Sequence, residues 1–162
     1  MISKKMNVLL NEQLNFEFHS AYLYLGMASY AASLGLNGFA GWFKFQAKEE
    51  MGHAVKFFEY IQQQGGDVVL GDVAGPTQKY AAAAQLFEES LKHERKVTKR
   101  IKDLAGAARK EDDYSTEAFL NWFLTEQVEE EAQLMDILQK LAIGGKTGNS
   151  LLILDGILAQ RK

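Results

Sequence analysis

The sequence predicts an all-α fold: an antiparallel four-helix bundle with one long crossover connection between the second and third helices, followed by a short fifth helix. Three observations support this prediction. The chain of 162 residues contains a single proline, Pro76, and its glycines gather in a few places, which is typical of a few long helices. Apolar residues recur in steps of three and four along four segments. Short, long and short connections between these segments give two antiparallel hairpins joined by a crossover.

The first hairpin is expected to occupy the N-terminal part of the chain. Its first helix should run from Ser3, which we expect to be the N-cap, to about Ser33. The sequence "LGLNG" then breaks the chain, and Asn37 is expected to cap a second helix over about 38–64. The glycine-rich segment 65–80 is too long for a tight turn, so we expect it to cross the whole length of the bundle.

The second hairpin should follow the crossover. We expect its first helix at about 81–109 and its second at about 117–143, with Ser115 or Thr116 as the N-cap of the latter. The sequence "GGKTGNS" interrupts the pattern, and a short apolar helix is expected at about 150–160. A coiled-coil rod is the alternative arrangement, but the glycine breaks do not suit it.

The composition excludes several classes of protein. The length suits one domain, residues 1–162, with the bundle at about 3–143. The formal net charge is −3 and there is no basic block, so we expect no nucleic-acid partner. The absence of cysteine excludes disulfides, thiolate metal sites and cysteine nucleophiles. No long apolar run suggests a membrane span and the N-terminal segment is too polar for a signal peptide, so a cytoplasmic location is expected.

Each of the four long helices carries polar residues in the middle of its inward-facing apolar stripe. These residues are Glu17 on the first helix, Gln46, Glu50 and His53 on the second, Glu94 and Thr98 on the third, and Gln127 and Glu130 on the fourth. A buried carboxylate without a partner costs several kcal/mol or stays protonated. No lysine or arginine falls on the stripes at this level, so metal ions are the remaining source of positive charge.

The spacing of these residues shows an internal repeat. Glu17 precedes Glu50 by 33 residues and His53 by 36, and Glu94 precedes Gln127 and Glu130 by the same two intervals. Adding 77 to each position of the first set therefore gives the second set. The two hairpins read as copies of one unit that face each other across a pseudo-twofold axis. Carboxylates and an imidazole from four helices at one level predict a metal site inside the bundle.

Four segments resemble the metal-site motifs of the ferritins, specifically the bacterial non-haem kind. They are "NEQLNFEFHSAYLYL" (11–25), "QAKEEMGH" (46–53), "LKHE" (91–94) and "TEQVEEE" (125–131). The resemblance extends along essentially the whole chain. It implies a ferroxidase that oxidises Fe²⁺ with O₂ or H₂O₂ and stores ferric oxide mineral inside a hollow homo-oligomeric shell of about 24 subunits with octahedral symmetry. Aromatic residues outside the stripes are expected at subunit contacts; these are Phe18, Tyr30, Trp42 and Phe58.

The resemblance also implies the roles of individual residues at a site for two irons. One iron would be held by Glu17 and His53 and the other by Glu94 and Glu130, with Glu50 bridging both. Gln127 would lie close to the pair and bind oxygen species or water, and Tyr24 would lie beside it as a hydrogen-bond donor or a source of an electron.

A third iron position is implied by the match to bacterial ferritins, with Glu49, Glu126 and Glu129 as ligands and Glu130 shared. The spacing alone is equally compatible with a solvated acidic face, so both interpretations stay open here.

Other members of the wider family are less compatible with the sequence. Met51 follows Glu50, as the haem-binding methionine does in bacterioferritins, but those proteins carry a second Glu-x-x-His where this chain has Gln127 and Glu130, so we expect no haem. A DNA-coating mini-ferritin would place its ligands across a dimer interface, and rubrerythrins need cysteine. A purely structural bundle would bind no metal. His19 and His93 fall outside the constellation and are expected at the surface or in contacts.

Overall fold

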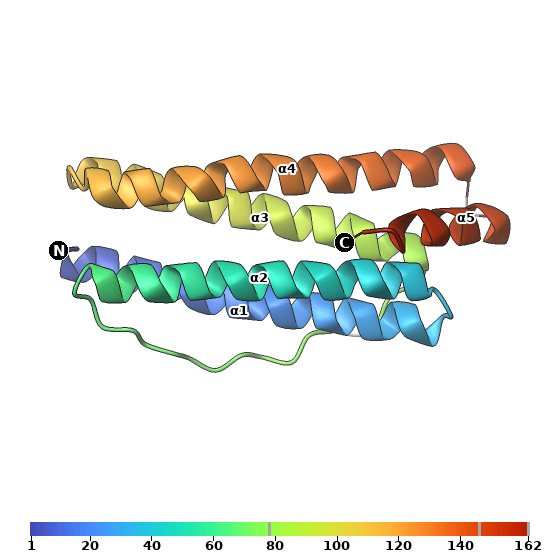
Figure 1. The fold of residues 1–162 in the computed structure, drawn as a ribbon, viewed down its shortest axis with the longest axis horizontal. Coiled ribbons are helices and arrows are strands. Elements are labelled where there is room, and N and C mark those ends of the chain that lie inside the picture. The colour runs from blue at the N-terminus through green and yellow to red at the C-terminus, as the bar shows by residue number, and fades with distance from the viewer. Residues whose placement is uncertain (78, 146, 162) are drawn as a thin grey trace.

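The computed structural model describes residues 1–77, 79–145 and 147–161 and contains five helices within them. They are α1 (Lys4–Ser33), α2 (Asn37–Gln63), α3 (Ala83–Lys110), α4 (Tyr114–Gly144) and α5 (Gly148–Leu158). Figure 1 shows α1 beside α2 and α3 beside α4 as two hairpins, with the connection from α2 to α3 running the length of the first hairpin. The predicted fold class is therefore confirmed. None of the helices described is both long and apolar enough to cross a bilayer.

Two of the three predicted caps are wrong, for different reasons. Ser3 does cap α1, because its hydroxyl accepts a hydrogen bond from the Met6 amide at 3.0 Å. The N-cap of α4 is Asp113 rather than Ser115 or Thr116, which lie inside the helix. Its carboxylate accepts a hydrogen bond from the Thr116 amide at 3.0 Å. Its negative charge also interacts more favourably with the positive end of the helix dipole than a hydroxyl group would.

The N-terminus of α2 is capped by a residue that is distant in sequence. Asn37, the predicted cap, is the first residue of the helix, and Leu36 before it makes no side-chain cap. Instead the Oδ1 atom of Asp155, on α5, accepts a hydrogen bond from the Phe39 amide at 2.8 Å. The backbones of α5 and α2 approach closely here, so that a Cβ atom on Gly38 would lie 1.9 Å from the Asp155 carbonyl oxygen. A glycine is therefore required where α5 meets α2.

The crossover is held to α1 by asparagines spaced four residues apart. The side chain of Asn11 accepts from the Val69 amide at 2.6 Å and donates to the Asp67 carbonyl at 2.8 Å. Asn15 likewise accepts from the Gly71 amide at 2.7 Å and donates to the Val69 carbonyl at 2.8 Å. These amides supply the backbone partners that an extended segment outside a sheet otherwise lacks.

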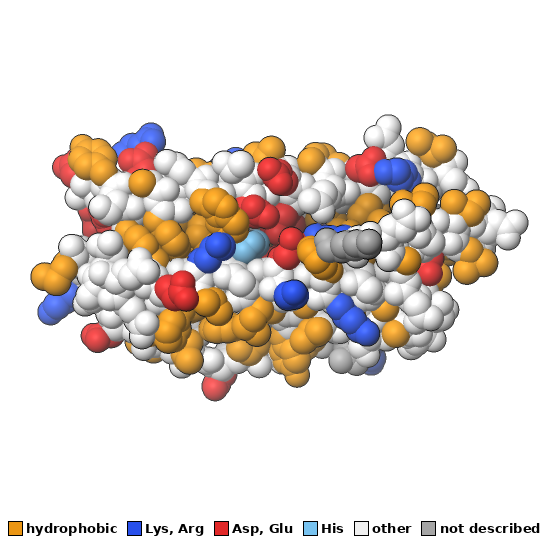
Figure 2. All heavy atoms as spheres, viewed as in Figure 1, with side chains coloured by type: hydrophobic (Ala, Val, Ile, Leu, Met, Phe, Trp, Pro, Cys, Tyr) orange, Lys and Arg blue, Asp and Glu red, His pale blue; other side chains and the backbone are white. Residues whose placement is uncertain are grey.

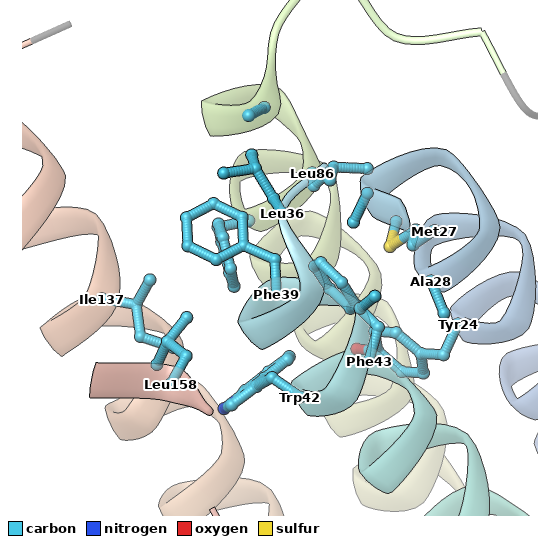
Figure 3. Close-up of a cluster of buried hydrophobic side chains, with 14 of the residues drawn as sticks. Tyr24, Met27, Ala28, Leu36, Phe39, Trp42, Phe43, Leu86, Ile137 and Leu158 are labelled. Atoms are coloured by element: carbon cyan, nitrogen blue, oxygen red, sulfur yellow. The ribbon is translucent and has the colours of Figure 1, made fainter. Parts of the chain in front are cut away.

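The core consists of two apolar clusters, one towards each end of the bundle. The first includes Tyr24, Phe39, Trp42 and Phe43, and Figure 3 shows Trp42 pointing towards Leu158 of α5. The second is built from the opposite ends of the same four long helices and includes residues such as Leu10, Phe57, Ile101 and Phe123. The expectation that Trp42 needs a subunit contact for burial is wrong, because its own chain leaves only 4 % of it exposed.

Candidate metal centre

The polar residues predicted on the stripes meet between the two apolar clusters. The five predicted di-iron ligands are all buried, with exposed fractions of 0 % for Glu17 and Glu94, 1 % for Glu50, and 4 % for His53 and Glu130. Each comes from the middle of its helix, so the long rigid segments on either side fix its depth. Figure 2 shows acidic side chains and a histidine grouped midway along the seam between the two hairpins, where the cluster approaches the surface.

The donor atoms of these residues lie close enough together to hold metal ions. One ligand atom each from Glu17, Glu50 and His53 lie within 4.8 Å of one another, and the same holds for Glu50, Glu94 and Glu130. The two groups share Glu50. The internal repeat pairs Glu50 with Gln127, so the symmetry is broken at the centre: one carboxylate serves both groups, and an amide stands at the equivalent position.

Hydrogen bonds orient three of the four carboxylates. The Gln13 amide donates to Oε1 of Glu17 at 2.7 Å, and the Gln46 amide donates to Oε1 of Glu130 at 3.0 Å. Neither glutamine was expected to bond a ligand, although Gln46 lies on the predicted stripe of the second helix. Gln13 could have been found from its position four residues before Glu17, where a helix brings two side chains together.

Glu94 is held differently, by the two remaining predicted neighbours of the site. The Tyr24 hydroxyl donates to one of its carboxylate oxygens, and the Gln127 amide donates to the other at 3.0 Å. The Gln127 amide also lies 3.4 Å from the Thr98 hydroxyl. In this arrangement Gln127 positions a carboxylate, whereas the family resemblance implied that it binds oxygen species. Burial, followed by the charge of Glu94, raises the pKa of Tyr24 well above its usual value, so the phenol keeps its proton.

Glu50 is the exception, because neither of its carboxylate oxygens has a hydrogen-bond partner among the residues described. The Nδ1 atom of His53 lies 3.3 Å from Oε2 of Glu50. One oxygen of Glu17 and one of Glu130 also lack partners within the described chain. Buried carboxylate oxygens without donors are costly unless a cation or a proton satisfies them. These atoms are therefore the ones available to a metal.

The electrostatics of the cluster show how strongly it needs positive charge. Burial raises the pKa of Glu17 from 4.5 to about 7. Burial first, and then the neighbouring carboxylates, raise the pKa of Glu50 and of Glu130 well above the usual value. Burial lowers the pKa of His53 from 6.5 to about 4, so its imidazole is neutral at pH 7, as metal ligation requires. Without metal, the cluster holds protons in place of cations.

The predicted third iron position is assembled only in part. Glu126, half-buried, contributes a ligand atom within 4.8 Å of atoms of His53 and Glu130. Glu49 instead forms a 2.5 Å ion pair with Arg161. Glu129 is exposed and belongs to none of the candidate groups in the described part of the chain.

His19 and His93 lie outside the cluster and make packing contacts, one of the two placements expected for them. Both are half-buried. The ring of His93 stacks on Phe16 at a centroid distance of 5.4 Å, and its Nε2 atom lies 2.8 Å from the Ser20 hydroxyl. Burial lowers the pKa of His93 to about 3, so this histidine is a neutral packing residue.

Comparisons with known proteins agree with this geometry. The family described as "Ferritin: Ferritin-like domain" matches residues 7–143. A protein named bacterial non-heme ferritin from Staphylococcus epidermidis is 38 % identical over 161 residues, covering 99 % of this chain and 97 % of the relative. A protein of the same name from Staphylococcus aureus strain MRSA252 is also 38 % identical, with the same coverage. The crystal structure of an open pore ferritin from Archaeoglobus fulgidus has a TM-score of 0.98 at 45 % identity, covering 100 % of this chain and 99 % of that one.

Proposed function

Since the chain belongs to the ferritin family, we propose that it binds Fe²⁺ inside its four-helix bundle, oxidises it to Fe³⁺ and stores the product as a ferric oxide mineral. The observation that carries this proposal is the pair of buried donor groups that share Glu50. Iron is the substrate of this reaction. The cytoplasmic location expected from the sequence stays a prediction.

The arrangement of donors supports a site for two irons. Glu17 and His53 would hold one iron, Glu94 and Glu130 would hold the other, and Glu50 would bridge them. Glu50 suits the bridging role because it belongs to both groups and keeps both oxygens free of hydrogen bonds. Carboxylate oxygens are hard donors that favour Fe³⁺ over Fe²⁺, and so the ligand set favours oxidation. An iron at the third position would have Glu126 and Glu130 available, but Glu49 only if Arg161 moves away.

The stoichiometry matches a pair of irons and a two-electron oxidant. Each Fe²⁺ gives one electron, so two Fe²⁺, one O₂ and two protons yield two Fe³⁺ and one H₂O₂. With H₂O₂ as the oxidant, two Fe²⁺ and two protons yield two Fe³⁺ and two H₂O. Holding both irons in one site supplies both electrons to one oxidant molecule, which is the advantage of a dinuclear site. Tyr24 and Gln127 fix Glu94 while this happens.

Storage requires a compartment, and we propose a shell of about 24 subunits with octahedral symmetry. Its support in this chain is the apolar surface that remains uncovered. On α5, Leu154 and Leu158 pack into the first apolar cluster, whereas Leu152, Ile153 and Ile157 are 63 %, 67 % and 48 % exposed. A short helix with apolar residues on both sides needs a second partner, and a neighbouring subunit would provide it.

The proposal is tested by rapid mixing of metal-free protein with Fe²⁺ and O₂, with the ferric product followed by its ultraviolet absorbance. We expect His53→Ala to slow the fast phase at least about tenfold, because it removes one of the few ligands of the first iron. His19→Ala is the matched control, since this histidine lies outside the cluster and should leave the rate unchanged. An unaltered fast phase in His53→Ala would contradict the proposed ligand set.

A further inference from the structure

Two arginines reach the metal centre indirectly, each through a glutamine. The Nε atom of Arg100 donates to Oε1 of Gln13 at 2.8 Å, and Gln13 donates to Glu17. The Nη1 atom of Arg161 donates to Oε1 of Gln46 at 2.9 Å, and Gln46 donates to Glu130. The two chains of hydrogen bonds have the same order of residue types, arginine to glutamine to glutamate. They are not copies related by the internal repeat, because adding 77 to position 13 does not give position 46. One ends at each half of the centre.

Each arginine determines which way its glutamine faces. A guanidinium only donates hydrogen bonds and an ionised carboxylate only accepts them. A glutamine between the two must therefore turn its oxygen to the arginine and its nitrogen to the glutamate. Gln13 and Gln46 are 0 % and 2 % exposed, so in the intact chain these two protein groups, and not bulk water, satisfy each amide. Without the arginine, the amide is free to rotate and present its oxygen to the carboxylate, which is repulsive.

The arginines are themselves held in place by aromatic rings. The guanidinium carbon of Arg100 lies 4.3 Å from the centre of the Phe16 ring. That of Arg161 lies 4.5 Å from the centres of both Trp42 and Phe45. Planar guanidinium groups stack well on such rings, and the contact limits their rotation. A turn after α5, with the Arg161 amide bonded to a carbonyl of that helix, directs this side chain back onto α2.

A second contact fixes each guanidinium. Arg100 also donates to the backbone carbonyl of Glu12 at 3.1 Å. Arg161 also donates to the Glu49 carboxylate at 2.5 Å. Each arginine is thus tied at two points besides its ring. The glutamine leads to the donor groups that share Glu50, and the second contact of Arg161 is Glu49, which the third iron position would need.

We propose that Arg100 with Gln13, and Arg161 with Gln46, form two relays that position Glu17 and Glu130 for metal binding, one relay for each half of the centre. This inference rests on the proposed function. All four are positioning residues, because none of them would touch iron. Loss of a residue that orients a metal ligand typically weakens metal binding about 10- to 100-fold. Each relay should therefore control the affinity of its own iron and leave the other iron nearly unaffected.

The test is anaerobic calorimetric titration of the metal-free, assembled protein with Fe²⁺, which measures binding without turnover. In a His53→Ala background the remaining strong site should be the Glu94–Glu130 half. There, Arg161→Ala is expected to weaken Fe²⁺ binding about tenfold, and Arg100→Ala less than about twofold. Arg109→Ala is the matched control, because Arg109 pairs with Glu117 on the surface. Size-exclusion chromatography of each variant checks assembly.

A double-mutant cycle tests whether Arg161 acts through Gln46. Because they belong to one relay, Arg161→Ala and Gln46→Leu together should weaken binding no more than either alone. Full additivity, or equal effects of Arg100→Ala and Arg161→Ala on the remaining site, would overturn the relay. If Arg161→Ala does not assemble, Arg161→Lys decides: it keeps the charge but not the planar fork, so an intermediate loss supports the proposal and an unchanged affinity overturns it. A wild-type protein that binds no Fe²⁺ would overturn the proposed function as well.

Discussion

Replacing Glu17 by glutamine should make the metal-free protein more stable, and the gain should grow with pH. Glu17 is fully buried, and its pKa in the folded protein is about 7 instead of 4.5. A carboxyl group with a raised pKa favours the folded state when it is protonated. That contribution is complete below pH 4.5 and is lost as the pH rises through about 7. The glutamine that replaces Glu17 would keep an acceptor for the Gln13 amide and would never ionise.

The size of the effect follows from the two pKa values. Linkage gives a destabilisation by Glu17, relative to a group that does not titrate, of about 1 kcal/mol at about pH 5.5 and about 3 kcal/mol at about pH 7.5. The difference between the two conditions is about 2 kcal/mol. The histidines of the chain also titrate in this range with the opposite sign, but they are present in both proteins and cancel in the comparison. For a chain of this length, about 2 kcal/mol corresponds to a change in Tm of about 4 to 8 °C.

The assay is thermal unfolding of both proteins at the same concentration, with a chelator present, at the two pH values. The Tm of Glu17→Gln minus that of the wild type should rise by about 4 to 8 °C between the lower and the higher pH. Adding a redox-inert divalent cation should reverse the order of stability, because only the wild type gains the full ligand set. A difference in Tm that does not change with pH would refute the reasoning.

Three further predictions concern other parts of the molecule. Glu130→Ala should weaken the second Fe²⁺ site more than the first in an anaerobic titration; equal weakening of both would contradict the assignment. Asp113→Ala should lower the free energy of unfolding by about 1 kcal/mol through loss of the α4 cap, and Ser115→Ala by much less, as measured by denaturant titration. Gly38→Ala should displace α5 and reduce shell assembly in size-exclusion chromatography, since its Cβ would lie 1.9 Å from a carbonyl oxygen. Gly41→Ala is the control, because none of the described residues lies within 4 Å of its Cβ position; if both variants assemble equally well, the close contact has no role.

The parts of the fold that the sequence predicts well are those encoded within a single helix. The apolar stripe of α2 was predicted from its three- and four-residue steps, and its members, including Phe43, Glu50 and Phe57, are buried as expected. The lengths of the connections predicted which helices pair, and the 77-residue repeat predicted which residues share a level. The stripe depends on helical periodicity, which is a local property, and the repeat can be read by comparing the two halves of the sequence, with no knowledge of contacts.

The contacts that the sequence did not reveal join segments far apart in the chain. Asp155 caps α2 from a distance of 116 residues, and Arg161 bonds Gln46 from a distance of 115. Neither residue has a local pattern that marks its partner. The arginines near the site were missed for the same reason. No arginine lies on the stripes, yet two arginines reach the site from its edges through glutamines.

The break in the repeat has a reason in the charge of the site. Four ionised carboxylates and a neutral His53 carry a charge of −4, which two Fe²⁺ ions would cancel. If the repeat were kept, position 127 would hold a second copy of Glu50 and position 130 a second copy of His53, and the buried charge would again be −4. This chain has a carboxylate at position 130 in place of the imidazole, so a second carboxylate at 127 would be the fifth in the site. Burial already raises the pKa of Glu50 well above its usual value, and a fifth carboxylate at this depth would hold a proton in place of metal. An amide at position 127 avoids that cost and still donates a hydrogen bond to Glu94. A symmetric fold thus builds an asymmetric pair of sites around one shared carboxylate, and the two irons should differ in affinity.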